Sequence, residues 1–206
     1  MSRVISYIDG FNLYFGLKGK GWKRYYWLDL AALSTSLLKP EQTLLATHYF
    51  TARLRMAGKN HADKQRQDDY LDALATRPNL HIHHGHYLKK MRQCRSCGAQ
   101  WPDYEEKMTD VNIAVQLLAD AFDDHFDTAL IISADSDLTT PVQFVRKRFP
   151  QKRIIVAQPP GRNSVQLANA ATAAFTLSQT KIRQSQLPDT ITTSAGIVLQ
   201  RPATWK

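Results

Sequence analysis

The chain has 206 residues, 43% of them hydrophobic and 22% charged, with a formal net charge of +9. This length favours a single domain, with room for an insertion or a tail. No apolar run approaches the roughly 18 residues that a membrane span requires. The N-terminal stretch turns acidic too early for a signal peptide, and two cysteines are too few for a disulfide framework. We therefore expect a cytoplasmic protein without a membrane partner.

Strand and helix patterns alternate along the chain. In chain order, the pattern predicts a strand over residues 4–8, a helix over 28–38, a strand over 43–50, a helix over 60–75, a strand over 80–87, a helix over 105–122, a strand over 128–133, a helix over 138–148, a strand over 153–157 and a helix over 164–171. Such alternation is typical of an α/β sandwich with a mainly parallel sheet.

The chain becomes polar from about Ser178 onwards. This last stretch contains Pro188 and many threonines, so we expect an extended or poorly ordered tail. The sequence therefore predicts one domain over residues 1–177 and a C-terminal extension or tail over 178–206.

The positive charge is concentrated in the first half of the chain. Residues 1–100 hold 16 Lys and Arg against 7 Asp and Glu, whereas residues 101–206 hold 11 of each. Basic side chains can serve solubility alone, but this asymmetry also fits a surface that binds a polyanion. Cations interleaved with aromatic residues suit phosphates and stacked bases, although some of the rings are also core candidates. The residues concerned are Lys18, Lys20, Lys23 and Arg24, with Trp22, Tyr25, Tyr26 and Trp27.

Aspartates stand where two predicted strands end. Asp9 closes the first apolar run, and Asp135 and Asp137 follow the run over residues 128–133. The carboxyl ends of parallel strands border a common crevice, which is where open α/β sheets bind ligands. Gly10 is expected to let the backbone turn sharply after Asp9. These acids are therefore candidates for a shared cation site.

Two further residues are candidates for the same site. Asp110 lies early in the helix expected over residues 105–122, and its neighbours on the apolar stripe direct it inward. Asn12 follows Asp9 by three residues. The alternative for each aspartate is an ordinary helix cap, which is the stronger interpretation for Asp137 and the weaker one for Asp9.

Three segments resemble the motifs of a known family. Residues 7–14 (YIDGFNLY) are similar to the opening motif of NYN domains, the PIN-like nuclease group that includes the LabA-like proteins. Residues 106–111 (EKMTDV) are similar to that family's Glu-Lys-x-x-Asp-Val helix start, and residues 133–138 (SADSDL) to its Ser-Gly-Asp-Ser-Asp-Phe segment, with Ala134 in place of the glycine. The resemblance covers roughly residues 3–177. It implies a Rossmann-like, PIN-type three-layer sandwich with a central, mainly parallel sheet.

The resemblance also implies a ribonuclease that depends on Mg²⁺ or Mn²⁺. Carried over by position, the metal-binding acids are Asp9, Asp110 and Asp135, with Asp137 as a fourth catalytic candidate. Asn12 would orient a ligand or contact the phosphate. Carboxylate oxygens are the ligands that these hard cations prefer, and such ions activate water and neutralise a scissile phosphate. We expect hydrolysis of phosphodiester bonds, with single-stranded RNA as the partner.

A segment rich in histidine and cysteine precedes the acidic helix. Cys94 and Cys97 have the spacing of a zinc knuckle, but they supply only half of a tetrahedral zinc site. Histidines within residues 81–86 could complete it. We expect this segment to form an inserted Cys-x-x-Cys hairpin at about residues 87–103, and the alternative to zinc is a reduced or oxidised cysteine pair that binds no metal.

The same segment carries several cations. Lys89, Lys90 and Arg92 would clamp the RNA backbone if the hairpin overhangs the acids. Lys107 is a further candidate for contact with the substrate, although a solvated lysine explains it equally well.

Two alternatives to a nuclease stay open. A non-catalytic RNA-binding or regulatory module would keep the fold, but pure binding does not require carboxylates near a phosphate. A small-molecule enzyme could use the crevice for a nucleotide, but Asp-Gly-Phe-Asn follows the first strand where a dinucleotide site would have Gly-x-Gly-x-x-Gly. The sequence does not determine the oligomeric state, and a homo-oligomer is one of the alternatives.

Overall fold

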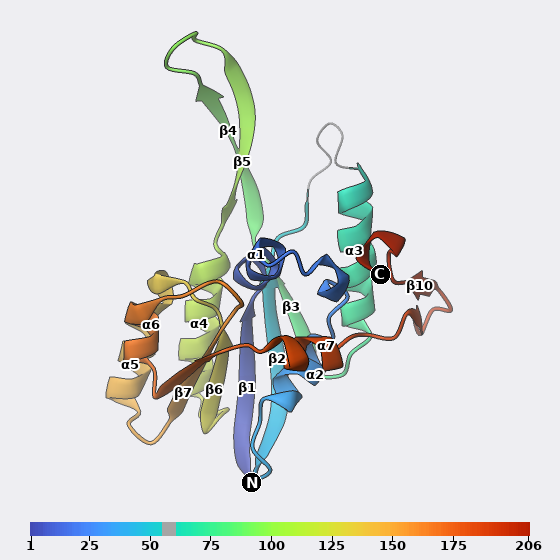
Figure 1. Ribbon diagram of the computed structural model, residues 1–206. Helices are drawn as coiled ribbons and strands as arrows, with labels where there is room; N and C mark the ends of the chain where they lie inside the picture. Colours follow the sequence, from blue (N-terminus) through green and yellow to red (C-terminus); the bar gives the residue numbers. More distant parts are fainter. Residues whose placement is uncertain (55–60) are drawn as a thin grey trace.

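The computed structural model describes residues 1–54 and 61–206, with the backbone alone described for residues 86–90 and 102–107. Its centre is a six-stranded parallel sheet in the order β3-β2-β1-β6-β7-β8 (Figure 1). The strands are β1 (Ser2–Asp9), β2 (Gln42–Thr51), β3 (Leu80–His84), β6 (Thr128–Ile132), β7 (Arg153–Gln158) and β8 (Ala173–Thr176). The strand order runs in opposite directions on the two sides of β1. The switch point, where such sheets bind ligands, therefore lies between β1 and β6.

Helices cover both faces of this sheet and make three layers. The core of one face includes side chains of α1 (Gly10–Gly19), α2 (Leu30–Ser36), α3 (His61–Ala75) and α7 (Gln179–Gln184), and the other those of α4 (Thr109–Phe122), α5 (Thr139–Arg148) and α6 (Val165–Ala170). In β1, Val4 and Ile8 belong to the first core and Ile5 and Tyr7 to the second, because successive strand residues point to opposite faces. The predicted α/β sandwich is confirmed. Within the described ranges, no helix is long and apolar enough to cross a membrane.

An antiparallel ribbon projects from the carboxyl edge of the sheet (Figure 1). It pairs β4 (His86–Gln93) with β5 (Gln100–Lys107), from His86 opposite Lys107 to Gln93 opposite Gln100. This pairing places residues 105–107 in a strand, so the prediction of a helix from residue 105 is wrong at that end and α4 begins at Thr109. The strand expected over residues 80–87 is likewise divided between β3 and β4. In both cases the pairing of β4 with β5 in one hairpin outweighs the local pattern.

The residues after Ser178 pack on the first face of the sheet. They form α7, an antiparallel pair of β9 (Thr190–Thr192) with β10 (Val198–Gln200), and the short helix η3 (Ala203–Trp205). This differs from the predicted extended or poorly ordered tail. The apolar residues of this stretch have no local periodicity from which an element could be predicted, yet they pack on a common hydrophobic surface. The buried ones are Ile182, Leu187, Ile191, Leu199 and Trp205.

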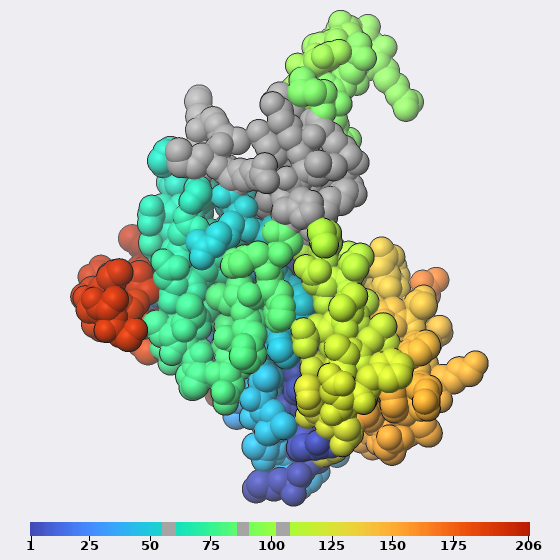
Figure 2. Space-filling model, turned by 180° about the vertical axis from the view of Figure 1, so that it is seen from behind, coloured from blue at the N-terminus to red at the C-terminus, as the bar shows by residue number. Residues whose placement is uncertain are grey.

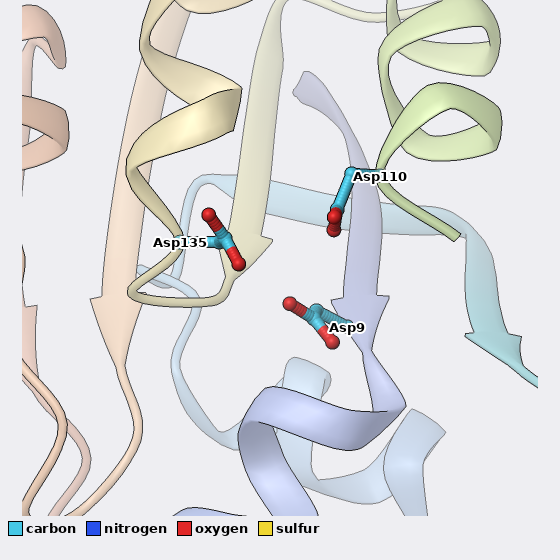
Figure 3. Close-up of side chains that lie close together, drawn as sticks. All are labelled: Asp9, Asp110 and Asp135. Atoms are coloured by element: carbon cyan, nitrogen blue, oxygen red, sulfur yellow. The ribbon is translucent and has the colours of Figure 1, made fainter. Parts of the chain in front are cut away.

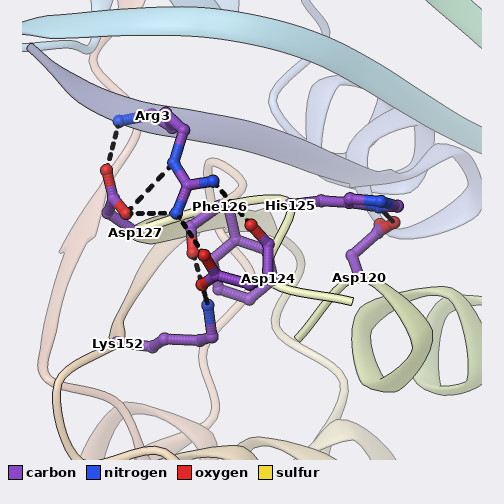
Figure 4. A network of polar contacts seen from close by, with 7 residues as sticks. All are labelled: Arg3, Asp120, Asp124, His125, Phe126, Asp127 and Lys152. Atoms are coloured by element: carbon purple, nitrogen blue, oxygen red, sulfur yellow. Dashed lines mark hydrogen bonds and ion pairs between the residues drawn. The ribbon is translucent and has the colours of Figure 1, made fainter. Parts of the chain in front are cut away.

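A polar network ties the amino ends of three strands together (Figure 4). Arg3 donates its backbone N–H to Asp127 Oδ2 at 2.7 Å, and its guanidinium binds both Asp127 and Asp124. Lys152, which is 4% exposed, donates to the Phe126 carbonyl at 2.7 Å and to Asp124. Because these residues begin or precede β1, β6 and β7, the network lies at the edge opposite the strand-end aspartates.

Seen from behind, the region of β3 reaches the surface between α3 and α4 (Figure 2). His81 and His84 of this strand are exposed. His48 of β2 is 8% exposed, and its ring stacks on that of His81 with the centroids 5.2 Å apart. His48, His81 and His83 therefore form a histidine cluster at this edge of the sheet.

Candidate metal centre

Three aspartates converge at the carboxyl edge of the sheet (Figure 3). Asp9 ends β1, Asp135 follows β6, and Asp110 lies in the first turn of α4. Each offers one carboxylate oxygen, and these oxygens all lie within 4.8 Å of one another. The side chains point toward a common space in Figure 3. The structure thus brings together the three acids that the sequence placed in one crevice.

The register of the sheet explains this convergence. Ile8 of β1 is paired with Ile132 of β6, so Asp9 and Ser133 follow at the same level. Asp9 also has the same strand parity as Tyr7, which directs its side chain to the face that α4 covers. Met108 adopts a left-handed conformation with φ 79° and turns the chain from β5 directly into α4. These features deliver carboxylates from three separate elements to one place.

Two of the three acids are also helix caps. Asp9 Oδ1 accepts the backbone N–H of Asn12 at 2.9 Å, and its Oδ2 accepts the Ser133 hydroxyl at 2.8 Å. Asp135 Oδ1 accepts the backbone N–H of Asp137 at 3.0 Å and caps the short helix η2 (Ser136–Leu138). A carboxylate has about four acceptor positions, so capping is compatible with binding a cation. The capping that the structure shows is therefore compatible with the predicted metal binding.

Asn12 connects the loops around the three acids. Asn12 is 4% exposed, and its side-chain Oδ1 accepts hydrogen bonds from the Ala134 N–H at 3.1 Å and from Arg162 Nε at 3.0 Å. Ser133 makes a second connection, since its hydroxyl accepts the Asp135 N–H at 3.0 Å while donating to Asp9. Asn12 is therefore placed to hold the loop after β6 against the start of α1.

Sequence reasoning missed Arg162 and the role of Ser133. Arg162 follows β7, which is the neighbour of β6 in the sheet, so its loop emerges at the same carboxyl edge. That position after a predicted strand was the available signal. Ser133 stands directly between the last residue of β6 and the loop that carries Asp135. Its place at the start of the family-like segment over residues 133–138 was the available signal.

The acids line a cavity of about 270 Å³. Its wall contains three aspartates and one arginine, so its formal charge is negative. Two oxygens on opposite sides of Mg²⁺ are about 4.2 Å apart, and those around a larger cation somewhat more. The oxygen separations here fit that requirement with small side-chain adjustments. The lining residues are Asp9, Phe11, Asn12, Phe15, Thr109, Asp110, Asp135 and Arg162.

The remaining predicted site residues do not join this cluster in the described part of the chain. Asp137 is exposed and contributes its backbone N–H to the η2 cap. Arg92 is exposed on the ribbon strand β4. The side chains of Lys89, Lys90 and Lys107 lie outside the described residues, so their contact with a substrate stays a prediction.

The two cysteines lie in the turn that joins β4 and β5. The Cys94 N–H donates to the Ala99 carbonyl at 2.8 Å, and the Gly98 N–H donates to the Cys94 carbonyl at 3.0 Å. Backbone N–H groups of Cys97 and Ser96 lower the pKa of the Cys94 thiol, which favours the thiolate that metals bind. Both cysteines are free, and zinc binding by Cys94 and Cys97 stays a prediction.

Comparison with known proteins connects this geometry to a family. A model of the NYN domain matches residues 3–200. The chain is 28% identical to 6-hydroxy-3-succinoylpyridine 3-monooxygenase HspA of Pseudomonas putida, over 78% of this chain and 61% of that relative, so it spans about three-fifths of the relative's length. A crystal structure of a protein of unknown function from Vibrio parahaemolyticus is similar with a TM-score of 0.55 and 15% identity, over 86% of this chain and 94% of that one. The last likeness concerns the fold alone.

Proposed function

The chain belongs to the NYN domain family, and from that premise we propose that it is a metal-dependent ribonuclease that hydrolyses phosphodiester bonds in single-stranded RNA. The observation that carries the proposal is the approach of the Asp9, Asp110 and Asp135 carboxylates to within 4.8 Å of one another. Carboxylates this close repel one another in a partly buried pocket, so a divalent cation is their natural partner. Mg²⁺ and Mn²⁺ suit the site because both prefer carboxylate oxygen.

Each residue around the cavity has a proposed task. Asp9, Asp110 and Asp135 would hold the cation, which when bound neutralises the scissile phosphate and activates water. Ser133 fixes the orientation of Asp9 by donating to its Oδ2. Arg162 lies in the cavity wall, where its planar guanidinium suits a phosphate oxygen.

Other residues would contribute from farther away. Asp137 is proposed as an auxiliary catalytic residue at the start of η2. Lys107, Lys89, Lys90 and Arg92 are proposed contacts of the RNA backbone, because their ribbon leads directly into the helix that carries Asp110.

The test is cleavage of labelled single-stranded RNA in Mg²⁺ and in Mn²⁺. We expect Asp9→Asn and Asp135→Asn to lower the cleavage rate by about 100- to 1,000-fold, because losing a metal ligand removes several kcal/mol of transition-state stabilisation. Asp137→Asn should have a smaller effect. Metal affinity of the same variants, measured by calorimetry, should fall in parallel.

The matched control is Asp123→Asn, an exposed acid at the opposite end of α4. Its rate should stay at the wild-type value. Unchanged cleavage in both Asp9→Asn and Asp135→Asn would contradict the assignment of these residues. A wild-type protein that binds RNA but cleaves none in any divalent cation would instead favour a non-catalytic RNA-binding module.

The likeness to a pyridine monooxygenase favours a second candidate function, the oxidation of a small heteroaromatic compound. The relative is longer than this chain, so its activity is carried over only as a candidate. A protein inert on RNA that hydroxylates 6-hydroxy-3-succinoylpyridine when given a reductant and oxygen would replace the first proposal with this one.

A further inference from the structure

A second, larger cavity lies beside the acidic one. Its volume is about 790 Å³, and it lies along α1 between η1 (Lys23–Tyr25), α3 and η3. We call it the α1 groove. We propose that the α1 groove binds the unpaired bases of single-stranded RNA next to the scissile phosphate. This inference rests on the proposed function for its choice of ligand, but its test does not require cleavage.

The α1 groove adjoins the cavity of the three acids. Phe11 and Phe15 line both cavities. They are four residues apart on α1 and therefore lie on one side of that helix. A strand whose phosphate reaches the acids would pass these two rings on its way out of the site.

The groove presents aromatic rings to solvent. Tyr14 is 41% exposed and Phe15 is 47% exposed, although large apolar rings are usually buried. The ring of Tyr14 lies 5.2 Å from that of Phe15 and 5.1 Å from that of Tyr26, and Tyr26 lies 5.6 Å from Trp205. Each nucleobase has a flat face that can stack on such rings whatever its sequence. The exposed rings of Tyr14 and Phe15 therefore suit stacked bases, and Tyr26 and the buried Trp205 pack behind them.

The charge of the groove favours an anion. Its lining includes Lys18, Lys23 and Arg66 against one acid, Asp63. Lys18 Nζ lies 5.7 Å from the ring centroid of Tyr14 and 5.8 Å from that of Phe15, so a cation accompanies the two exposed rings. Phosphates between stacked bases need such cations, whereas an apolar peptide or a neutral aromatic compound does not.

Tyr26 adds an uncharged hydroxyl to this wall. Burial, followed by the neighbouring Tyr14, raises the pKa of Tyr26 to about 12. The phenol therefore stays protonated in neutral solution and does not repel a phosphate. The groove thus combines rings, cations and a neutral donor.

The experiment measures binding in EDTA, where metal-dependent cleavage does not proceed. Fluorescence anisotropy is recorded with a labelled ten-nucleotide oligoadenylate, with the same strand in a duplex, and with an abasic oligomer of equal length. The wild-type protein should bind the single strand more tightly than either of the other two. Tyr14→Ala and Phe15→Ala should each weaken binding of the single strand by about 5- to 100-fold, because each removes one stacking surface.

Two control variants separate stacking from general effects. Phe144 on α5 is 47% exposed, as Phe15 is, but it lies outside the α1 groove. Phe144→Ala should therefore not change the affinity for RNA. Phe15→Tyr keeps a ring at the site and should retain wild-type binding. Lys18→Met should reduce the salt dependence of binding, whereas Lys147→Met on α5 should not.

Several results would overturn the inference. They are wild-type affinity in the Tyr14→Ala/Phe15→Ala double variant, equal binding of the abasic oligomer, or binding of heteroaromatic compounds without binding of RNA. If Asp9→Asn loses cleavage while the double variant binds RNA as tightly as the wild type, only the proposed base binding in the α1 groove is contradicted. If RNA binding depends on the groove but the protein cleaves no RNA, only the proposed ribonuclease activity is contradicted.

Discussion

Asp9 and Gly10 are adjacent residues whose identities are set by different neighbours. Asp9 is 3% exposed and joins the cap of α1 to the candidate metal centre. Gly10 was expected to permit a sharp turn, but the structure gives a different reason for it. A Cβ atom at this position would lie 2.7 Å from the Phe50 carbonyl oxygen and 2.8 Å from the ring of Tyr49. The close approach of β2 therefore requires glycine here.

Gly10→Ala should lower the free energy of unfolding by about 1–3 kcal/mol, because the added methyl group meets backbone that cannot move aside easily. Urea unfolding followed by circular dichroism measures this. Gly19→Ala is the matched control at the other end of α1, where a Cβ atom meets nothing within 4 Å. It should leave stability unchanged or raise it slightly. Equal stability of Gly10→Ala and wild type would contradict the packing argument.

At the scale of elements, the amino ends of β1, β6 and β7 depend on a buried cation. The ammonium group of Lys152 donates to the Phe126 carbonyl and lies 5.0 Å from the Phe126 ring centroid. Hydrogen bonds from Lys152 and then from Arg3 lower the pKa of Asp124 to about 2. The Asp124 side chain is 67% exposed, so water can take the place of Lys152 there. The hydrogen bond from Lys152 to the Phe126 carbonyl is buried, and water does not replace it.

Lys152→Met should therefore destabilise the protein by about 1–3 kcal/mol, since it leaves the Phe126 carbonyl without this donor. Thermal and urea unfolding measure the loss. Lys147→Met, an exposed lysine on α5, should change stability by less than about 0.5 kcal/mol. RNA cleavage by folded Lys152→Met should stay at the wild-type rate, because the network is at the edge opposite the acids. A reduced rate at full folding would contradict this separation.

The whole molecule should respond to pH through the histidine cluster behind the sheet. His48 Nδ1 lies 2.8 Å from His83 Nε2, and its ring also stacks on Tyr7 and His81. Burial lowers the pKa of His48 to about 4, although Asp120 acts in the opposite direction. Burial also lowers the pKa of His83. Both histidines are therefore held neutral in the folded state.

The folded pKa of His48 lies below the unfolded value of about 6.5, so the unfolded chain binds more protons between pH 6.5 and 4. The free energy of unfolding should fall as the pH is lowered from 6.5 to 4, and His48 should contribute at most roughly 3 kcal/mol to this fall. Urea unfolding at several pH values checks this. His48→Gln should show a shallower fall, whereas His61→Gln, at the exposed start of α3, should keep the wild-type slope. Identical slopes in the wild type and His48→Gln would contradict the assignment.

The sequence predicted the central strands well because their side chains report their surroundings. Residues 128–133 are continuously apolar since both faces of β6 are covered, and the predicted limits differ from the observed strand by one residue. Helix α1 was not predicted, because its ten residues include three glycines and have little helical propensity. Its stability comes from the Asp9 cap and from packing of Leu13 and Leu17 on the sheet.

The segment over residues 18–27 shows the limit of composition as a guide. Its mixture of cations and aromatic residues predicted contact with nucleic acid. The structure buries Trp27 and Tyr25 in the core, but it places Lys18, Lys23 and Tyr26 along the α1 groove. Which rings are structural and which face solvent depends on the packing of η1 and η3, which no local pattern encodes.

The sequence by itself determined the alternating α/β architecture, the family motifs and the acids at strand ends. These are local properties, since hydrophobic periodicity and residue order along the chain are enough to express them. Only the tertiary structure decided that Asp9, Asp110 and Asp135 meet within 4.8 Å, that Arg162 and Ser133 support them, and that the last residues help to form a groove. Those outcomes depend on sheet register and on contacts between segments more than 100 residues apart, such as Ser133 with Asp9. Distances of that kind are fixed by the packed core as a whole.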